Sequence, residues 1–223
     1  WGTAGEVTLT EGDIINIPTG IFRGFENIGT DYGMIMAILG GDDAGGGVIW
    51  APQVIEDAKN HGLILSDKGK LYDTKKGEQL PQNSKPMPLL SENELNQYPE
   101  PKTSKIIKNH VARYLDLKSL AYKKPTKVIG ESGKLKDKPG FEVDFLTESS
   151  NLDKILSSKP IVYMPLKGNW KVNWNNKNVI INAGDTLTFP ENIEHNIVSS
   201  MSGESALYKI IATDDPAGPT WEL

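Results

Sequence analysis

The feature that most constrains the fold of this chain is an internal repeat. Residues 12–46 recur without a gap at a constant offset of 172 positions along the 223-residue chain. The matched pairs are Gly12-Asp13 with Gly184-Asp185, Pro18 with Pro190, Arg23 with His195, Ile38 with Ile210, Asp42-Asp43 with Asp214-Asp215, and Gly46 with Gly218. One residue of slippage also places Trp1 over Trp174. Two prolines, several glycines and an Asp-Asp pair at one offset indicate two copies of one module.

Each copy has the sequence pattern of short β-strands. Residues 5–18 (GEVTLTEGDIINIP) alternate between polar and apolar and then turn at Gly12-Asp13. Residues 171–190 do the same, with NNKN as a hairpin turn. The apolar runs 32–41 (YGMIMAILGG) and 206–213 (ALYKIIAT) are typical of strands that are buried on both faces. Many short strands separated by turn signals predict an all-β fold, either a sandwich or a small barrel.

The segment between the copies has a different sequence pattern, with helix signals as well as strand and turn signals. Residues 51–62 (APQVIEDAKNHG) predict a short helix, with a proline near its start and a glycine after its end. Residues 63–74 (LILSDKGKLYDT) predict a hairpin that turns at Asp67–Gly69, and Ser91 with Glu94 predicts a capping box. No catalytic motif occurs in this segment, which we interpret as a partly helical linker.

Both copies carry a pattern that resembles the second motif of the cupin superfamily, G-x5-P-x-G-x2-H-x3-N. Residues 12–27 match it at Gly12, Pro18, Gly20 and Asn27, with Arg23 at the histidine position. Residues 184–199 match it at Gly184, Pro190 and His195, with Asn192 for the second glycine and Ser199 for the final asparagine. With two copies of the motif, the chain resembles a bicupin.

The resemblance implies a fold class of two cupin jelly-roll β-barrels joined by a partly helical linker. The expected units are residues 1–50, the C-terminal part of the first barrel, residues 51–140, the linker, and residues 141–223, the second barrel. Upstream of Trp174 the second copy has a hairpin's worth of further β-sequence that has no counterpart before Trp1. We therefore expect the first barrel to be N-terminally incomplete here, with a missing segment or another chain completing it.

The resemblance also defines where metal ligands would lie, because metal cupins combine the second-motif histidine with a first motif, G-x5-H-x-H-x3/4-E-x6-G. Counting back from Gly168, the glutamate position of the second copy is Ile161. The two histidine positions fall on Lys154 and Leu156 or on Ile155 and Ser157. In the first copy, Arg23 has no lone pair to offer a metal. The predicted sites therefore have degenerate metal motifs, and we expect Fe, Mn, Ni or Zn only if the first barrel supplies ligands before Trp1.

Arg23 and His195 are the candidate ligand-binding residues, and no catalytic residue is assigned. The guanidinium of Arg23 could bind a carboxylate or phosphate with two hydrogen bonds, or it could form a structural ion pair with Glu26. His195 could bind a ligand or exchange protons near neutral pH, or it could be a relic hydrogen-bonded beside Glu194. His61 is interpreted as a helix cap.

Composition excludes some classes of function. A formal charge of −5 argues against nucleic acid as a partner. The chain has no cysteine, so no disulfide or thiolate ligand is available. No apolar run is long enough to span a membrane. We expect a cytoplasmic location, and exposed β edges favour a homodimer.

Three functions remain open at this stage. The first is a bicupin that binds a small, anionic molecule in a barrel pocket, independently of metal at least in the second barrel. The second is a metal-dependent, dioxygenase-like cupin enzyme with its ligands upstream of Trp1. The third is a structural or storage role. The fold does not select among them.

Overall fold

A computed structural model describes residues 5–17, 21–39, 49–98, 102–135, 140–150, 152–200 and 202–213, and this part of the chain is mostly β with few helices. Four α-helices lie at α1 (Pro52–Asn60), α2 (Glu92–Leu95), α3 (Thr103–His110) and α4 (Tyr114–Leu120). The first strands are β1 (Ile14–Ile15), β2 (Leu63–Leu65), β3 (Leu71–Asp73), β4 (Val111–Ala112) and β5 (Thr126–Ile129). The remaining strands are β6 (Phe141–Thr147), β7 (Leu152–Ile155), β8 (Ile161–Lys167), β9 (Asn169–Trp174), β10 (Lys177–Asn182), β11 (Leu187–Phe189), β12 (His195–Ser199) and β13 (Ala206–Ala212).

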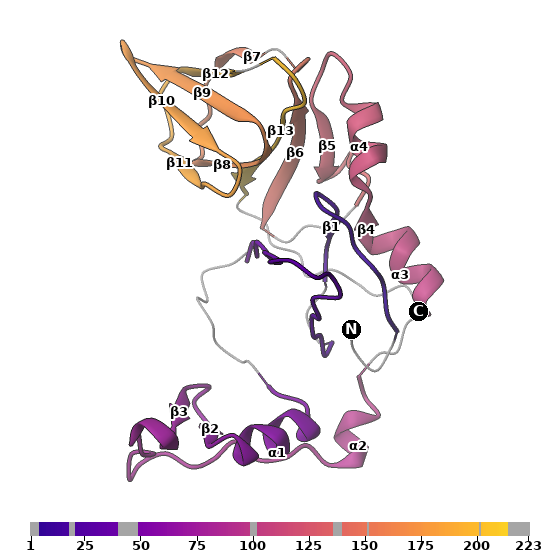
Figure 1. Cartoon of the computed structure of the whole chain (residues 1–223), viewed down its shortest axis with the longest axis vertical. Helices are drawn as coiled ribbons and strands as arrows, with labels where there is room; N and C mark the ends of the chain where they lie inside the picture. Colours follow the sequence, from indigo (N-terminus) through magenta and orange to yellow (C-terminus); the bar gives the residue numbers. More distant parts are fainter. Residues whose placement is uncertain are drawn as a thin grey trace.

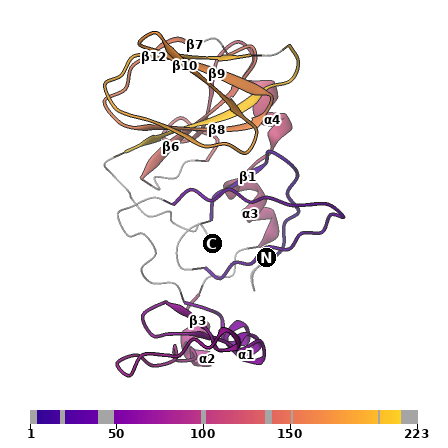
Figure 2. The same ribbon diagram turned by 60° about the vertical axis from the view of Figure 1, so that its left-hand side comes forward.

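Two antiparallel sheets face each other in the C-terminal part of the chain (Figures 1 and 2). One sheet has five strands in the order β11-β8-β13-β6-β5, and the other has four in the order β10-β9-β12-β7. Between them lies a hydrophobic core to which strands of both sheets contribute, among them Leu146, Tyr163, Trp170, Val172, Ile197 and Leu207. The arrangement is therefore a β-sandwich whose inner faces exclude water.

The outer face of the five-stranded sheet is also covered. Helix α4, strand β4 and residues of the first copy pack on this face, where Phe145 and Tyr208 belong to a second hydrophobic cluster. The first copy contributes Ile14, Met36 and Ile38 to it. Because β13 is buried on both faces, its near-continuous apolar sequence has a direct physical explanation.

Several local predictions are confirmed. The β9–β10 turn places Asn175 and Asn176 at φ values of 44° and 62°, which suits a two-residue hairpin turn. Strands β2 and β3 form the predicted hairpin, and Ser91 and Glu94 form both hydrogen bonds of a capping box. Helix α1 has its proline in the first turn and ends at His61, which caps it as expected.

The two copies of the repeat share one turn geometry. In residues 10–13 the backbone N–H of the first residue donates to the aspartate carboxylate over 2.9 Å, and in residues 182–185 the same bond is 2.8 Å. The glycine before each aspartate is left-handed, with φ of 82° at Gly12 and 88° at Gly184. This agreement extends the sequence repeat to backbone conformation.

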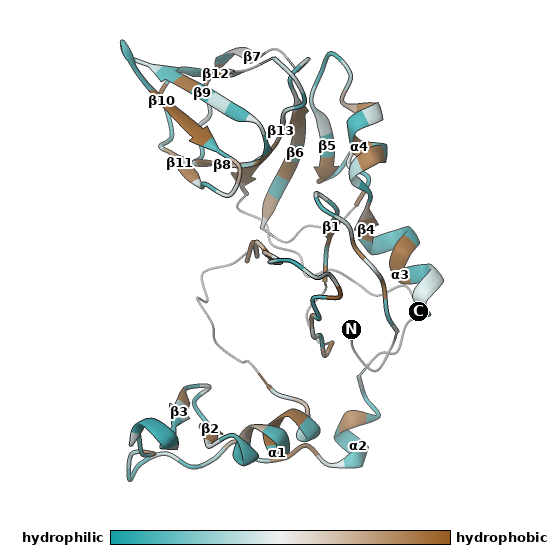
Figure 3. Ribbon diagram, viewed as in Figure 1, coloured by the Kyte–Doolittle hydropathy of each residue, from teal (hydrophilic) through white to brown (hydrophobic). Residues whose placement is uncertain are grey.

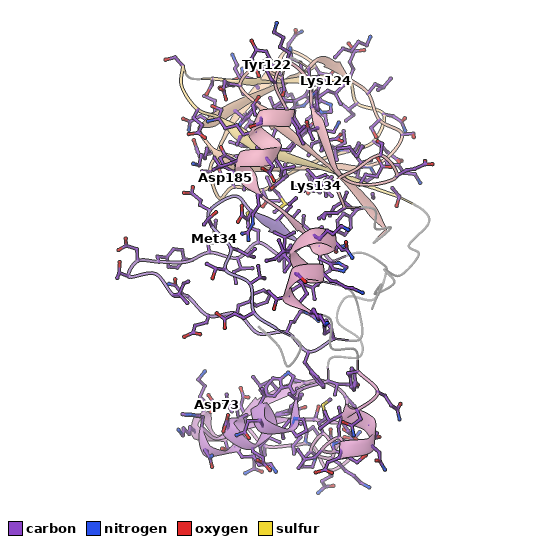
Figure 4. All side chains as sticks on the ribbon, turned by 90° about the vertical axis from the view of Figure 1, so that its right-hand side faces the viewer. Met34, Asp73, Tyr122, Lys124, Lys134 and Asp185 are labelled. Carbon is purple, nitrogen blue, oxygen red and sulfur yellow. The ribbon has the colours of Figure 1, made fainter. Side chains whose placement is uncertain are left out.

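The repeat also preserves which side chains face the core. Met36 and Ile38 contact the same hydrophobic cluster as Tyr208 and Ile210, which lie 172 positions further on. Figure 4 shows Met34 below Asp185, and a Cβ built on Gly184 would lie 3.5 Å from the Met34 terminal methyl carbon. The first copy therefore packs against the second through equivalent residues.

The prediction of two jelly-roll barrels is confirmed only in its coarser form, a mostly β fold with few helices. The C-terminal copy consists of two facing sheets that do not close into a barrel. Within residues 5–17 and 21–39 the structure has a single strand, β1, which pairs with β4. Residues 33–39 form no backbone hydrogen bond among the described residues. In this segment the side chains of Ile35 and Leu39 are 63% and 76% exposed. A first barrel therefore stays a prediction, because residues 34–39, which the repeat aligns with β13, form no strand.

The predicted linker divides into two parts. Figure 1 places α1, β2, β3 and α2 at the opposite end of the molecule from the two sheets. In contrast, β5 pairs with β6 and α4 packs on the sheet, although both precede residue 141.

In the described part of the chain, no helix combines the length and apolar character needed to cross a bilayer.

A buried carboxylate connects the first copy to the linker. Asp13, whose side chain is 2% exposed, accepts hydrogen bonds from the Arg113 guanidinium at 2.7 Å and from the Tyr114 N–H at 2.8 Å. Burial works against its ionisation, but these bonds and those from Thr10 outweigh burial and lower the pKa of Asp13. Gly12 lies against the same Tyr114 ring, so a side chain there would clash. The turn is thus fixed by one charged pair and one close contact.

We expect Arg113→Gln to lower the free energy of unfolding by about 2 kcal/mol, because the substitution leaves the buried Asp13 carboxylate without its charged partner. Urea denaturation at neutral pH measures this change. Lys105→Gln removes one positive charge at an exposed position and serves as the matched control. Equal unfolding free energies for the two variants would show that the pair contributes nothing.

Candidate functional site

His195 opens strand β12 and points into the sandwich. The strand pairs with β9 on one side and with β7 on the other, and the histidine ring is 4% exposed. Asn196 and Val198, one and three residues after His195 on the strand, face the opposite side of the sheet. The motif position that places His195 here therefore aims its ring inward, as the resemblance implies.

Both ring nitrogens of His195 have partners within the protein. Nδ1 lies 2.9 Å from the carbonyl oxygen of Ile193, and Nε2 lies 2.6 Å from the hydroxyl of Tyr163. A carbonyl oxygen only accepts, so Nδ1 carries the proton of the neutral ring and Nε2 accepts from the Tyr163 O–H. The lone pair that a metal would use is occupied by this hydrogen bond.

Aromatic rings surround the His195–Tyr163 pair. Phe189 stacks on the imidazole at 3.8 Å between ring centroids, with the two rings tilted by 30°, and Trp174 meets Phe189 edge-on at 5.6 Å. Burial among these rings lowers the pKa of His195, and the positive charge of Lys209 lowers it further. The hydrogen bond to the Ile193 carbonyl acts in the opposite direction but does not outweigh burial. Burial also raises the pKa of Tyr163. Both groups are accordingly neutral near pH 7.

A row of polar residues crosses the inner face of the five-stranded sheet at the register of Tyr163. Lys127 on β5 pairs with Asp144 on β6, Asp144 with Lys209 on β13, and Lys209 with Tyr163 on β8. Asp144 accepts from both ammonium groups, at 2.9 Å from Lys127 and 2.8 Å from Lys209. Lys127 also reaches Glu142 at 2.6 Å. These charges neutralise one another, so the row stabilises the sheet edge without presenting a free cation.

The residues around His195 do not fit a metal ion. Ile161, at the glutamate position, is packed in the core between the sheets, and so is Ile155 at one of the histidine positions. Lys154 instead forms an ion pair with Glu194 at 2.6 Å. Within the described ranges, no three His, Cys, Asp or Glu side chains come close enough together to hold a metal.

Arg23 lies apart from this pair. It is exposed in the irregular segment 21–29, and among the described residues it has neither a hydrogen bond nor an ion pair. The alternative pairing with Glu26 does not form. The alternative partner of His195, Glu194, is engaged by Lys154 instead. The structure does not place Arg23 in the pocket that His195 lines.

An open pocket of about 410 Å³ lies where the β9–β10 hairpin meets the start of β12. It is lined by Asn173, Trp174, Asn175, Asn176, Lys177, Asn178, Glu194, His195 and Asn196. Sequence reasoning assigned NNKN only to a turn and overlooked the other asparagines. It also missed Tyr163, which reads as one more residue of an apolar strand.

No family model and no curated protein matches this chain. The solved structures that it resembles include a cupin-2 domain protein from Shewanella frigidimarina, at 14% identity over 51% of this chain and 97% of that one, with a TM-score of 0.37. A protein from Neisseria meningitidis shares 15% identity over 44% and 97% of the two chains, with a TM-score of 0.35. A cupin superfamily protein from Desulfitobacterium hafniense shares 15% over 36% and 73%, with a TM-score of 0.32.

We expect Tyr163→Phe to destabilise the fold by about 1–3 kcal/mol, because Nε2 of His195 becomes a buried acceptor without a donor. Urea denaturation near pH 7.5 measures the loss. Tyr122→Phe, which removes a hydroxyl at a 67% exposed position, is the control.

The same site makes stability depend on pH. Since the pKa of His195 is lowered on folding, its contribution is complete above about pH 6.5 and is lost as the pH falls from there through the folded value. Wild-type protein should therefore lose unfolding free energy over this window, and His195→Gln should lose less. An equal loss in both proteins would contradict the account.

Proposed function

We propose that the chain is a cupin-type protein with two copies of its module that binds a small, anionic molecule and uses no metal ion in its C-terminal copy. One observation carries this proposal: His195, the histidine of the cupin-like motif, has both ring nitrogens engaged by Tyr163 and Ile193. A ligand for a transition metal needs a free lone pair. The C-terminal copy then contributes structure, with its histidine serving as an internal hydrogen-bonding group.

The two-copy organisation is supported by the shared turns at residues 10–13 and 182–185. It is further supported by Met36 and Ile38, which pack where their equivalents pack. The two copies thus share a turn conformation, its hydrogen bond and the side chains that pack in the core. Duplication of one module accounts for all three.

The anionic class of ligand rests on the contrast between the two arginines of the chain. Arg113 is committed to Asp13 and to the carbonyl of Thr8, at 2.7 and 2.8 Å. Arg23 occupies the motif's histidine position, is exposed, and makes no such bond among the described residues. A guanidinium with its five N–H donors available suits a carboxylate or phosphate. We infer that Arg23 orients the ligand.

Elemental analysis tests the metal-independent part. Protein purified without chelators, and then reconstituted with Fe(II), Mn(II), Ni(II) or Zn(II), should retain well under one equivalent of any metal after gel filtration. Tyr163→Phe removes the hydrogen bond to Nε2 of His195 and provides an internal comparison. This variant should also bind no stoichiometric metal, because the other metal ligands are missing. A full equivalent bound by the wild-type protein would overturn the metal-independent assignment of the C-terminal copy.

A panel of small carboxylates and phosphates, followed by thermal stability, tests the role of Arg23. A ligand at a hundredfold excess over its Kd stabilises the folded state by about 2.7 kcal/mol. Arg23→Gln should remove this stabilisation and leave the unliganded protein unchanged. Lys105→Gln should behave as wild type. If no anion stabilises the wild-type protein, or if Arg23→Gln responds equally, a structural role is favoured.

A further inference from the structure

Three asparagines lie in cross-strand register on the outer face of the four-stranded sheet. Asn178 on β10 is paired with Asn173 on β9, and Asn173 is paired with Asn196 on β12. Their chain neighbours Val172 and Ile197 point to the opposite face, into the core between the sheets. The row therefore faces away from the interior that holds Tyr163.

The row is partly organised by its own hydrogen bond. Asn173 donates from Nδ2 to Oδ1 of Asn196 over 2.7 Å. This bond fixes both carboxamides and leaves the Asn173 carbonyl oxygen and the Asn196 amino group without another partner among the described residues. One acceptor and one donor are thus held side by side, at the spacing of neighbouring strands, about 5 Å.

The hairpin tip and the loop before β12 extend the row into the open pocket of about 410 Å³. Asn175 and Asn176 form the turn, and Figure 3 shows this tip as hydrophilic, in contrast to the hydrophobic β10 strand below it. Trp174 also lines the pocket, half-buried. The Trp174 ring packs on the inner face of the sheet against Phe189, so the polar surface of the pocket consists mainly of amide groups.

The charges of the pocket do not favour an anion. Its lining has one positive and one negative side chain, Lys177 and Glu194, next to a neutral His195. Lys177 sits at the exposed hairpin tip. The carboxamides outnumber the charges, and each offers both donors and acceptors. Hydroxyl groups, which donate and accept, are the natural complement of such a surface.

We propose that this pocket binds a neutral polyhydroxylated ligand, a carbohydrate. The carboxamides of the asparagine row and of the turn residues Asn175 and Asn176 hydrogen-bond its hydroxyl groups, as both donors and acceptors. The volume falls within the range of small-molecule sites. This site is separate from the one assigned to Arg23, which does not line it.

Titration calorimetry with cellotetraose, maltotetraose, laminaritetraose and chitotetraose tests the proposal on the wild-type chain. At least one of these should bind, and the double variant Asn173→Ala/Asn196→Ala should raise its Kd at least tenfold. Asn83→Ala removes an exposed asparagine elsewhere and should leave the Kd unchanged. The double variant keeps the inner face of the sheet intact, which its melting temperature verifies.

A second readout needs no variant. In ¹H–¹⁵N spectra of the wild-type protein, the binding sugar should shift the side-chain amide signals of Asn173, Asn178 and Asn196 and leave that of Asn83 unchanged. The proposal is overturned if none of the four sugars binds at 10 mM, or if the shifts fall elsewhere. Tighter binding of glucuronate than of glucose would overturn the neutral class of ligand. Retained binding by Arg23→Gln would show that the two sites are independent.

Discussion

The five-stranded sheet is the constraint on which the rest of the structure depends, because both of its faces must be covered. The four-stranded sheet covers one face and α4 covers the other, together with Met36 and Ile38 from the first copy. A sheet buried on both sides leaves little room for polar groups without partners. The charged residues that do lie on it, Lys127, Asp144 and Lys209, accordingly form ion pairs, and Glu142 supplies the second carboxylate that balances the two lysines.

The same requirement explains how the core accommodates the imidazole of His195. A buried imidazole needs a partner for each ring nitrogen. Tyr163 and a backbone carbonyl meet that need for His195. With both hydrogen bonds made, His195 is part of the core. The asparagine row differs from it, because the Asn173 carbonyl oxygen and the Asn196 amino group have no further partner among the described residues.

The sequence predicted features that depend on neighbouring residues. The hairpin turn between β9 and β10, the capping box at Ser91 and the turn at Gly12-Asp13 are all confirmed, because each is decided by local backbone preferences. The structure places His195 in the interior. Its partner Tyr163 could not be predicted, because the contact depends on how two sheets face each other. The asparagine row similarly depends on strand register, which one sequence does not reveal.

The contacts of the first copy span nearly the whole chain. Gly12 accepts a hydrogen bond from the Tyr208 hydroxyl, and Ile14 pairs with Ala112. In contrast, the β9–β10 hairpin closes over two residues, and such hairpins form in about 1–10 μs. During synthesis, the amino-terminal residues leave the ribosome long before Tyr208 is made. Their burial is therefore a late folding event. Until the C-terminal sheet has formed, the apolar residues of the first copy remain exposed to solvent.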